Sequence, residues 1–305
     1  MSSVTAVAPA KLNLALAVGS PRKDGYHEVA TVYHAVALFD EVVASPSDGL
    51  RVTLDEKSSV AIEGVPVDAS NLAGRAAQLL ADETGRDPDV HLQLRKGIPV
   101  AGGMAGGSAD AAATLVACDA LWRTDVPRTD LAALAARLGS DVPFSLLGGT
   151  ALGHGRGEHL SPVLGRGRFD WVFALAEGGL STPAVYAECD RLREGRVLPE
   201  PRVSDAMMAA LRAGDATQLG AALHNDLQAA ACSLRPQLRQ TLEVGEECDA
   251  LGSIVSGSGP TVAFLARDAE HALDIAVGLS ASGVARMVKR THGPVAGARL
   301  GSEVG

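Results

Sequence analysis

Every second residue from Leu12 to Val18 is apolar, and this alternation is the strongest pattern in the first part of the chain. A period of two predicts a strand with one buried face. Residues 29–38 and 41–44 are rich in β-branched side chains and predict further strands, and residues 52–54 predict a short one. The chain therefore opens with several strands and little helix.

The period changes to that of a helix near residue 70. Apolar residues recur at helical spacing over residues 72–80. Ser70 or Asn71 is expected to begin this helix, and Gly85 is expected to end it. Residues 90–94 alternate again and predict another strand.

Glycine and alanine dominate the next part of the chain. The segment at residues 102–113 is rich in both and leads into a predicted helix that ends near Trp122. Thr129 is expected to cap a helix over residues 131–138, which Gly139 closes.

Residues 148–168 carry many glycines and few periodic apolar positions, so we place a domain boundary or a hinge hairpin there. The prediction is an N-terminal domain of residues 1–160 and a C-terminal domain of residues 161–305. Strands are expected at residues 169–176, 253–255, 261–266 and 286–290, and helices from residue 181 or 182, over most of 205–248, and over 268–281. Strands first and helices later favour an α+β protein of two domains over a regular doubly wound sheet.

Composition and charge narrow the class of protein. The chain has 305 residues and a formal net charge of -9, which argues against nucleic acid or an anionic membrane as a partner. No apolar segment reaches transmembrane length and no secretory leader precedes the first strand, so we expect a cytoplasmic protein, monomeric or homodimeric. The cysteines lie far apart and predict free thiols rather than a zinc site or a disulfide framework: Cys118, Cys189, Cys232 and Cys248.

The most specific local signal is Gly-Gly-Met-Ala-Gly-Gly-Ser at residues 102–108, between a predicted strand and a predicted helix. Glycines let backbone amides approach an anion, and a helix N-terminus favours phosphate. A tight turn that binds nothing is the alternative, but four glycines exceed what a turn requires. The P-loop lysine is missing, and neither a dinucleotide fingerprint nor a protein-kinase motif occurs, which leaves a nucleotide loop outside those classes.

Two charged residues accompany this loop. Lys11 shares its strand parity with Asn13, which would place two polar groups on one side of an otherwise apolar strand. Asp141 follows a helix stop and precedes Val-Pro; a turn aspartate is an equally good interpretation of it from the sequence alone. Asp24-Gly25 predicts a turn before Tyr26 and His27, with a hairpin that exposes the tyrosine as the alternative. Residues 256–261 are a second glycine-serine segment, which could be a simple hairpin loop or could close over the same ligand.

Together these segments resemble the GHMP family of small-molecule kinases. The family's three motifs occur in order as Pro-x-Lys-x-Asn at residues 9–13, the glycine loop at residues 99–109, and Gly-Ser-Gly-Pro-Thr at residues 257–261. Ala105 departs from the pattern because many members have glycine there, and Tyr186 stands where some members have another aromatic residue. The resemblance covers nearly the whole chain.

The resemblance implies a two-domain α+β fold with the active site in the cleft between the domains. It implies ATP with a divalent cation, Mg²⁺, no metal held by the protein alone, and an alcohol substrate that carries a cytidine diphosphate. Lys11 and Asp141 would be the catalytic residues. The ATP-binding set would be Asn71, Lys96, Pro99, Val100, Ala101, Gly102, Gly103, Met104, Ala105, Gly106, Gly107, Ser108 and Ala109. The substrate-binding set would be Asn13, Tyr26, His27, Thr182, Tyr186, Gly257 and Ser258.

Two alternatives remain open. The chain could be a family member for another alcohol, such as mevalonate, homoserine or a sugar. The segment Asp24-Gly25-Tyr26-His27 argues against this, because an aromatic clamp in which Tyr26 and Tyr186 sandwich a cytosine suits a nucleotide-bearing substrate. It could also be an inactive relative that binds nucleotide as a sensor or scaffold. The presence of both Lys11 and Asp141 argues against that reading.

Overall fold

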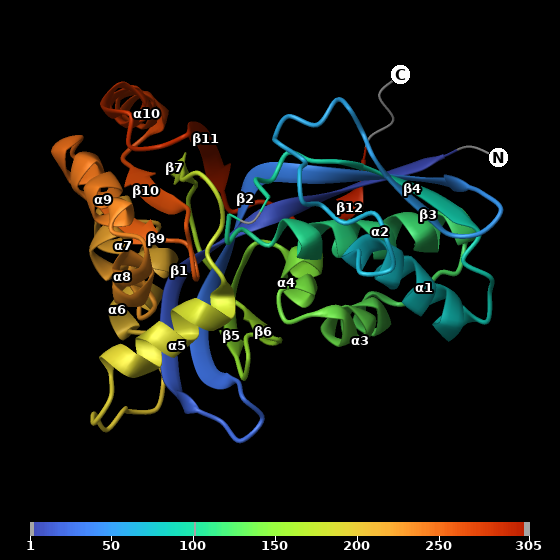
Figure 1. Cartoon of the computed structure of the whole chain (residues 1–305), viewed down its shortest axis with the longest axis horizontal. Coiled ribbons are helices and arrows are strands. Elements are labelled where there is room, and N and C mark those ends of the chain that lie inside the picture. Colours follow the sequence, from blue (N-terminus) through green and yellow to red (C-terminus); the bar gives the residue numbers. More distant parts are fainter. Residues whose placement is uncertain (1–2, 101, 302–305) are drawn as a thin grey trace.

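The computed structural model describes residues 3–100 and 102–301 (Figure 1). Two long antiparallel strands, β1 (Val4–Pro21) and β2 (His27–Pro46), run through the molecule and pair along most of their length. The larger sheet has the order β12-β1-β2-β4-β3, with β4 (Val90–Arg95), β3 (Arg51–Leu54) and β12 (Arg299–Leu300). Its remaining strands are β5 (Thr150–His154) and β6 (His159–Pro162), beyond β2, and β8 (His224–Asn225), beside β1.

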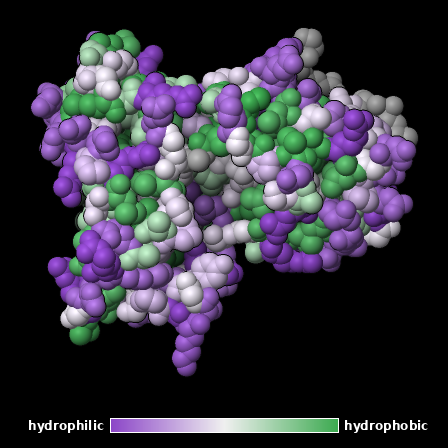
Figure 2. Space-filling model, viewed as in Figure 1, coloured by the Kyte–Doolittle hydropathy of each residue, from purple (hydrophilic) through white to green (hydrophobic). Residues whose placement is uncertain are grey.

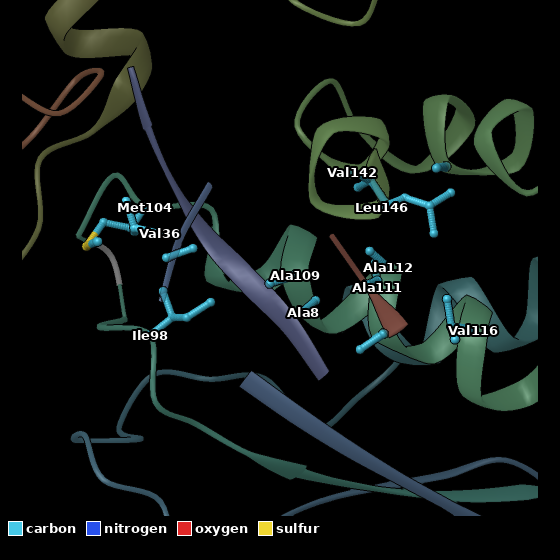
Figure 3. Packing of buried hydrophobic residues seen from close by; sticks show 14 of the residues in the cluster. Ala8, Val36, Ile98, Met104, Ala109, Ala111, Ala112, Val116, Val142 and Leu146 are labelled. Carbon is cyan, nitrogen blue, oxygen red and sulfur yellow. The ribbon is translucent and has the colours of Figure 1, made fainter. Parts of the chain in front are cut away.

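Four helices cover one end of this sheet. They are α1 (Leu72–Thr84), α2 (Gly106–Trp122), α3 (Arg128–Leu138) and α4 (Val142–Leu147). Helix α2 is buried on nearly all sides because small alanine side chains let it approach the strands closely. Figure 3 shows this packing, in which α2 lies among β1, β2 and α4: Ala8, Val36, Ile98, Met104, Ala109, Ala111, Ala112, Val116, Val142 and Leu146.

A second, four-stranded sheet lies at the other end of the molecule, with the order β11-β7-β10-β9. Its strands are β7 (Phe169–Leu175), β9 (Gly252–Val255), β10 (Val262–Ala266) and β11 (Met287–Gly293). Helices α5 (Thr182–Leu192), α6 (Asp205–Ala213), α7 (Ala216–Ala222), α8 (Gln228–Leu234), α9 (Gln237–Glu247) and α10 (Ala269–Ser282) accompany it. None of the helices within the described ranges has the length and hydropathy needed to cross a membrane.

Strand β1 connects the two hydrophobic cores. Leu12 and Leu14 belong to the core that includes α1 and α2, whereas Leu16 and Val18 belong to the core around α5, α8 and β10. One strand therefore runs from one core into the other (Figure 1). The cysteines are free, as predicted, whereas the division of the chain at residue 160 stays a prediction.

Several sequence-based expectations were wrong in detail. The predicted strands at 29–38 and 41–44 are one strand, and β1 is buried on both faces rather than one. Helix α3 begins after Pro127, so Thr129 lies inside its first turn and does not cap it.

The expectation of a hinge hairpin within residues 148–168 agrees with the structure, because residues 150–162 form the antiparallel hairpin of β5 and β6.

Candidate functional site

The glycine-rich loop forms one wall of a cavity of about 360 Å³. Residues from the segment before α1, from the end of β4 and from the start of α2 complete its lining. In Figure 2 the molecular surface is indented between the two ends of the molecule. Of the thirteen residues expected to bind ATP, ten line this cavity: Asn71, Lys96, Pro99, Val100, Gly102, Gly103, Met104, Ala105, Gly106 and Gly107.

The other three residues expected to bind ATP are Ser108, Ala109 and Ala101, and the first two are not among those that line the cavity. Ser108 lies in the first turn of α2, partly exposed. Ala109 is fully buried and its amide donates to the carbonyl of Ala105, so this amide is already used inside the helix. Ala101 lies outside the described residues. Asn71 caps α1 by accepting hydrogen bonds from the amides of Ala73 and Gly74.

The N-terminus of α2 has the properties of an anion site. Ala105 precedes the helix in a left-handed conformation, with φ +59°, which costs an alanine about 1 kcal/mol. No side chain among the described residues caps this helix end. The first amides of α2, with the positive end of the helix dipole, are therefore available to phosphate oxygens.

A buried ion network lies directly beneath the loop. The Lys96 ammonium contacts the carboxylates of Asp40 and Asp110. Asp40 also accepts hydrogen bonds from the amides of Gly97 (2.8 Å) and Ile98 (2.9 Å), so one carboxylate holds the chain as it leaves β4. Burial opposes the charge of Lys96, yet Asp110 and Asp40 raise the lysine's pKa above its ordinary value. Burial raises the pKa of Asp110 to about 7 in spite of Lys96.

Lys11 lies in the middle of β1 and is 7% exposed. Its ammonium donates to the side-chain oxygen of Asn13 at 2.6 Å, and the Asn13 amide donates to the Thr31 hydroxyl at 2.7 Å. The Lys11 backbone amide donates to the carbonyl of Met104 at 3.2 Å, which fastens the strand to the glycine loop. The common parity of Lys11 and Asn13 thus places both beside the loop.

Asp141 lies at the start of α4, opposite Lys11. Its Oδ2 is 3.8 Å from the Lys11 Nζ, and its Oδ1 accepts a hydrogen bond from the Tyr33 hydroxyl at 3.2 Å. The Asp141 side chain is 29% exposed, so the carboxylate remains accessible to a ligand. Burial, followed by the nearby Asp141 charge, raises the pKa of Tyr33 well above its ordinary value, which keeps the phenol protonated.

The second glycine loop reaches both the first loop and Lys11. The Ser256 hydroxyl donates to the carbonyl of Gly103 at 3.4 Å. A Cβ on Gly257 would lie 3.3 Å from the Asn13 side-chain oxygen and 3.4 Å from the Lys11 ammonium. Asn225, which the sequence analysis missed, donates to the carbonyl of Gly257 and holds this loop in place.

Among the residues expected to bind the substrate, Thr182 contacts Ser258, and His27 contacts Tyr186. The hydroxyls of Thr182 and Ser258 are 2.8 Å apart. The rings of His27 and Tyr186 have centroids 4.9 Å apart, and His27 Nε2 lies 2.9 Å from an Asp190 oxygen.

Tyr26 is 55% exposed. It lies under the guanidinium of Arg156, which is 4.9 Å from the ring centroid. The ring that Tyr186 contacts is that of His27, whereas Tyr26 contacts Arg156. The expected sandwich of a base between Tyr26 and Tyr186 stays a prediction.

The arrangement suits transfer between a bound polyphosphate and a hydroxyl. The start of α2 has uncapped amides, Lys11 is hydrogen-bonded through its backbone to the glycine loop, and the accessible carboxylate of Asp141 lies 3.8 Å from the Lys11 ammonium. Phosphoryl transfer depends mainly on such alignment and charge stabilisation. Within the parts of the chain that the structure describes, no three His, Cys, Asp or Glu side chains gather as a metal-ligand set. Such a lining fits a divalent cation that is held chiefly by phosphate oxygens and water and needs few protein ligands.

Comparison with known families matches both parts of the chain. Residues 71–149 match the GHMP kinases N terminal domain, and residues 207–285 match the GHMP kinases C terminal domain. A relative from Thermobifida fusca, named 4-diphosphocytidyl-2-C-methyl-D-erythritol kinase, is 56% identical over 304 residues, which cover 98% of each chain. A relative of the same name from Streptomyces coelicolor is 57% identical, with 98% of this chain and 99% of the relative covered.

Solved structures give the same picture at lower identity. A crystal structure of 4-(cytidine 5'-diphospho)-2C-methyl-D-erythritol kinase superimposes with a TM-score of 0.75 at 34% identity, covering 94% of this chain and 98% of that one. A homoserine kinase from Cytophaga hutchinsonii superimposes with a TM-score of 0.74 at 18% identity, covering 98% of both chains. At that identity the second likeness shows the shared fold alone.

Proposed function

The chain belongs to the GHMP kinase family, and on that premise we propose that it transfers the γ-phosphoryl group of ATP to the 2-hydroxyl of 4-diphosphocytidyl-2-C-methyl-D-erythritol. The reaction belongs to the non-mevalonate route to isoprenoid precursors. Full-length relatives at more than 50% identity carry the name of this activity, which supports the substrate assignment. The likeness to a homoserine kinase and to a mevalonate kinase, at 18% and 16% identity, supports the fold alone.

One observation carries the mechanistic part of the proposal. Lys11 Nζ and Asp141 Oδ2 lie 3.8 Å apart, although the two residues are far apart in the sequence. Lys11 is bonded through its own amide to the glycine loop. A cation and a carboxylate that converge beside a phosphate loop are the groups that transfer to an alcohol requires.

We assign the steps to these residues as follows. Amides at the start of α2 bind the β- and γ-phosphates of ATP. The substrate hydroxyl oxygen attacks the γ-phosphorus while the bond from phosphorus to the β–γ bridging oxygen breaks, and ADP leaves with that electron pair. Asp141 accepts the hydroxyl proton, and Lys11 offsets the negative charge that develops on the transferred group.

Adenine would occupy the cavity beside Asn71, whose side chain is buried at its wall. Lys96 lines the same cavity, but two carboxylates already hold its ammonium. We therefore propose that Lys96 supports the nucleotide loop from below and does not contact the phosphates directly.

The cytidine part of the substrate would bind near Tyr26, His27 and Tyr186, since stacking of a base on an aromatic face contributes about 1–3 kcal/mol. Thr182 and Ser258 share a hydrogen bond close to the second glycine loop and would contact the same substrate. Gly257 leaves room for Lys11 and Asn13 to approach the acceptor hydroxyl.

Mg²⁺ would enter with ATP, bound mainly by phosphate oxygens and water, and would supply further charge neutralisation. In this proposal the protein works in the cytoplasm, where ATP is available. The domain boundary near residue 160 and a monomeric or homodimeric state are parts of the same proposal.

Release of ADP, measured with a panel of alcohols, tests the assignment. We expect turnover with the cytidine diphosphate alcohol and little or none with mevalonate, homoserine or galactose. Mass spectrometry of the product should place one phosphoryl group on the methylerythritol 2-oxygen. Preference for another alcohol would contradict the substrate assignment, and nucleotide binding without turnover of any alcohol would favour the inactive relative.

A further inference from the structure

Tyr33 is a buried tyrosine in the middle of β2 whose hydroxyl reaches the candidate base. The phenol donates a hydrogen bond to Asp141 Oδ1 at 3.2 Å, while Asp141 Oδ2 faces the Lys11 ammonium at 3.8 Å. Each oxygen of one carboxylate therefore has its own partner from a different strand. This pairing fixes the rotation of the Asp141 side chain.

The ring of Tyr33 is itself held firmly. It is 4% exposed and stacks on Phe144 of α4, with centroids 4.9 Å apart and planes at 29°. On the neighbouring strand, Asn13 is its register partner, and Asn13 accepts the hydrogen bond from Lys11. The tyrosine thus contacts the elements that carry both catalytic residues.

Two glycines of the β5–β6 hairpin make room for the ring. A Cβ on Gly157 would lie 2.1 Å from the Tyr33 hydroxyl oxygen, and one on Gly153 would lie 2.8 Å from the ring. Gly157 also has φ +104°, a conformation that side-chain-bearing residues avoid. The glycine-rich segment that marked residues 148–168 in the sequence therefore has a local task, which is to accommodate Tyr33.

We propose that Tyr33 is a positioning residue for phosphoryl transfer, which orients Asp141 so that Oδ2 faces Lys11 and the acceptor hydroxyl. This inference rests on the proposed function, in which Asp141 is the base. The phenol is a donor to the carboxylate and does not contact the substrate. Its loss leaves the base present but free to rotate, and misalignment of a reacting group lowers the rate of the chemical step.

The test is Tyr33→Phe, which keeps the ring and removes only the hydroxyl. We expect kcat to fall about tenfold, the effect of one hydrogen bond to a charged acceptor, while KM for ATP and for the alcohol stays unchanged. Thr53→Val on β3 is the matched control, because it removes a hydroxyl that pairs with His91 at 2.8 Å outside the site. This control should keep the wild-type kcat.

A double-mutant cycle with Asp141→Asn separates positioning from general damage. In the wild-type background Tyr33→Phe should lower kcat because Asp141 Oδ1 loses its hydrogen-bond donor. In the Asp141→Asn background the base is already gone, so Tyr33→Phe should lower kcat further by much less. Additive losses in the cycle would overturn the proposal, because the two changes would then act independently.

The kcat values of the variants and of the wild-type protein are measured with the alcohol of the panel that the wild-type protein phosphorylates. Each rate is divided by the folded fraction, which circular dichroism measures. A different substrate would overturn the substrate assignment and leave the Tyr33 measurement intact. A Tyr33→Phe variant with wild-type kcat would overturn the role of Tyr33, whatever the substrate is. A rise in KM at unchanged kcat would overturn it too, since the tyrosine would then contact the ligand.

Discussion

His34 predicts a loss of stability in mild acid. It lies on β2, fully buried, with its ring 6.0 Å from that of Phe169 and 6.2 Å from that of Trp171. Its Nδ1 is 2.9 Å from the hydroxyl of Thr150, and no charged side chain is among these neighbours. Burial lowers the pKa of His34 from 6.5 to about 3, and it outweighs the opposing effect of the Gly293 backbone.

The sign and size follow from proton linkage. Below pH 6.5 the unfolded chain binds a proton on His34 and the folded protein does not, so the free energy of unfolding falls as the pH falls. This loss runs from pH 6.5 down to about pH 3, at about 1.4 kcal/mol per unit. Between pH 7 and pH 5 it amounts to about 2 kcal/mol, or about 4 °C in the thermal midpoint of a chain of this size.

The measurement is the unfolding midpoint of wild type and of His34→Gln at pH 7 and pH 5. The variant can be less stable at both values, but the difference between the two pH values should be smaller by about 2 kcal/mol. His224→Gln is the control. Asp226 raises the pKa of His224, so the contribution of His224 to the free energy of unfolding is present at low pH and is lost as the pH rises. His224→Gln should therefore change the pH dependence in the opposite direction to His34→Gln. Equal pH dependence in wild type and His34→Gln would refute the reasoning.

Three further predictions concern the site. Asp141→Asn should lower kcat by about 10²- to 10⁴-fold with little change in KM, and turnover near the wild-type rate in steady-state kinetics would remove this residue from the role of base. Tyr186→Ala should raise KM for the cytidine substrate by about tenfold and leave KM for ATP unchanged; equal changes in both constants would contradict stacking on cytosine. Lys96→Met should lower the free energy of unfolding by about 3–5 kcal/mol, because two buried carboxylates lose their cation. Arg137→Met removes only an exposed pair with Glu83 and should cost less than about 1 kcal/mol, so similar losses in urea unfolding would argue against the buried network.

The sequence predicted well those features that depend on a local period. The helix over residues 72–80 is present as α1 and ends at Gly85 as expected. The shared parity of Lys11 and Asn13 predicted two neighbouring polar side chains, and the structure joins them by a hydrogen bond. Period and parity require no knowledge of distant partners.

Features that depend on distant partners were missed. Residues 39 and 40 fall between two predicted strands, but both lie within β2, and the Asp40 carboxylate is buried against Lys96 and two backbone amides. Helix α4 has six residues, which is too short to display a helical period. Tyr33 lies within a predicted strand and was not singled out, because its hydrogen bond to Asp141 joins residues that are 108 positions apart in the chain.

The contact between the two glycine loops gives their composition a second explanation. A Cβ on Gly103 would lie 2.8 Å from the carbonyl oxygen of Ser256 and 2.9 Å from that of Gly259. These are backbone atoms of the loop between β9 and β10, so they cannot turn aside as a flexible side chain could. Glycine at position 103 is therefore required for the loops to meet, whether or not an anion is bound. Because Lys11 lies between them on a rigid strand, any residue that parts the loops would also misplace the phosphate site relative to the lysine.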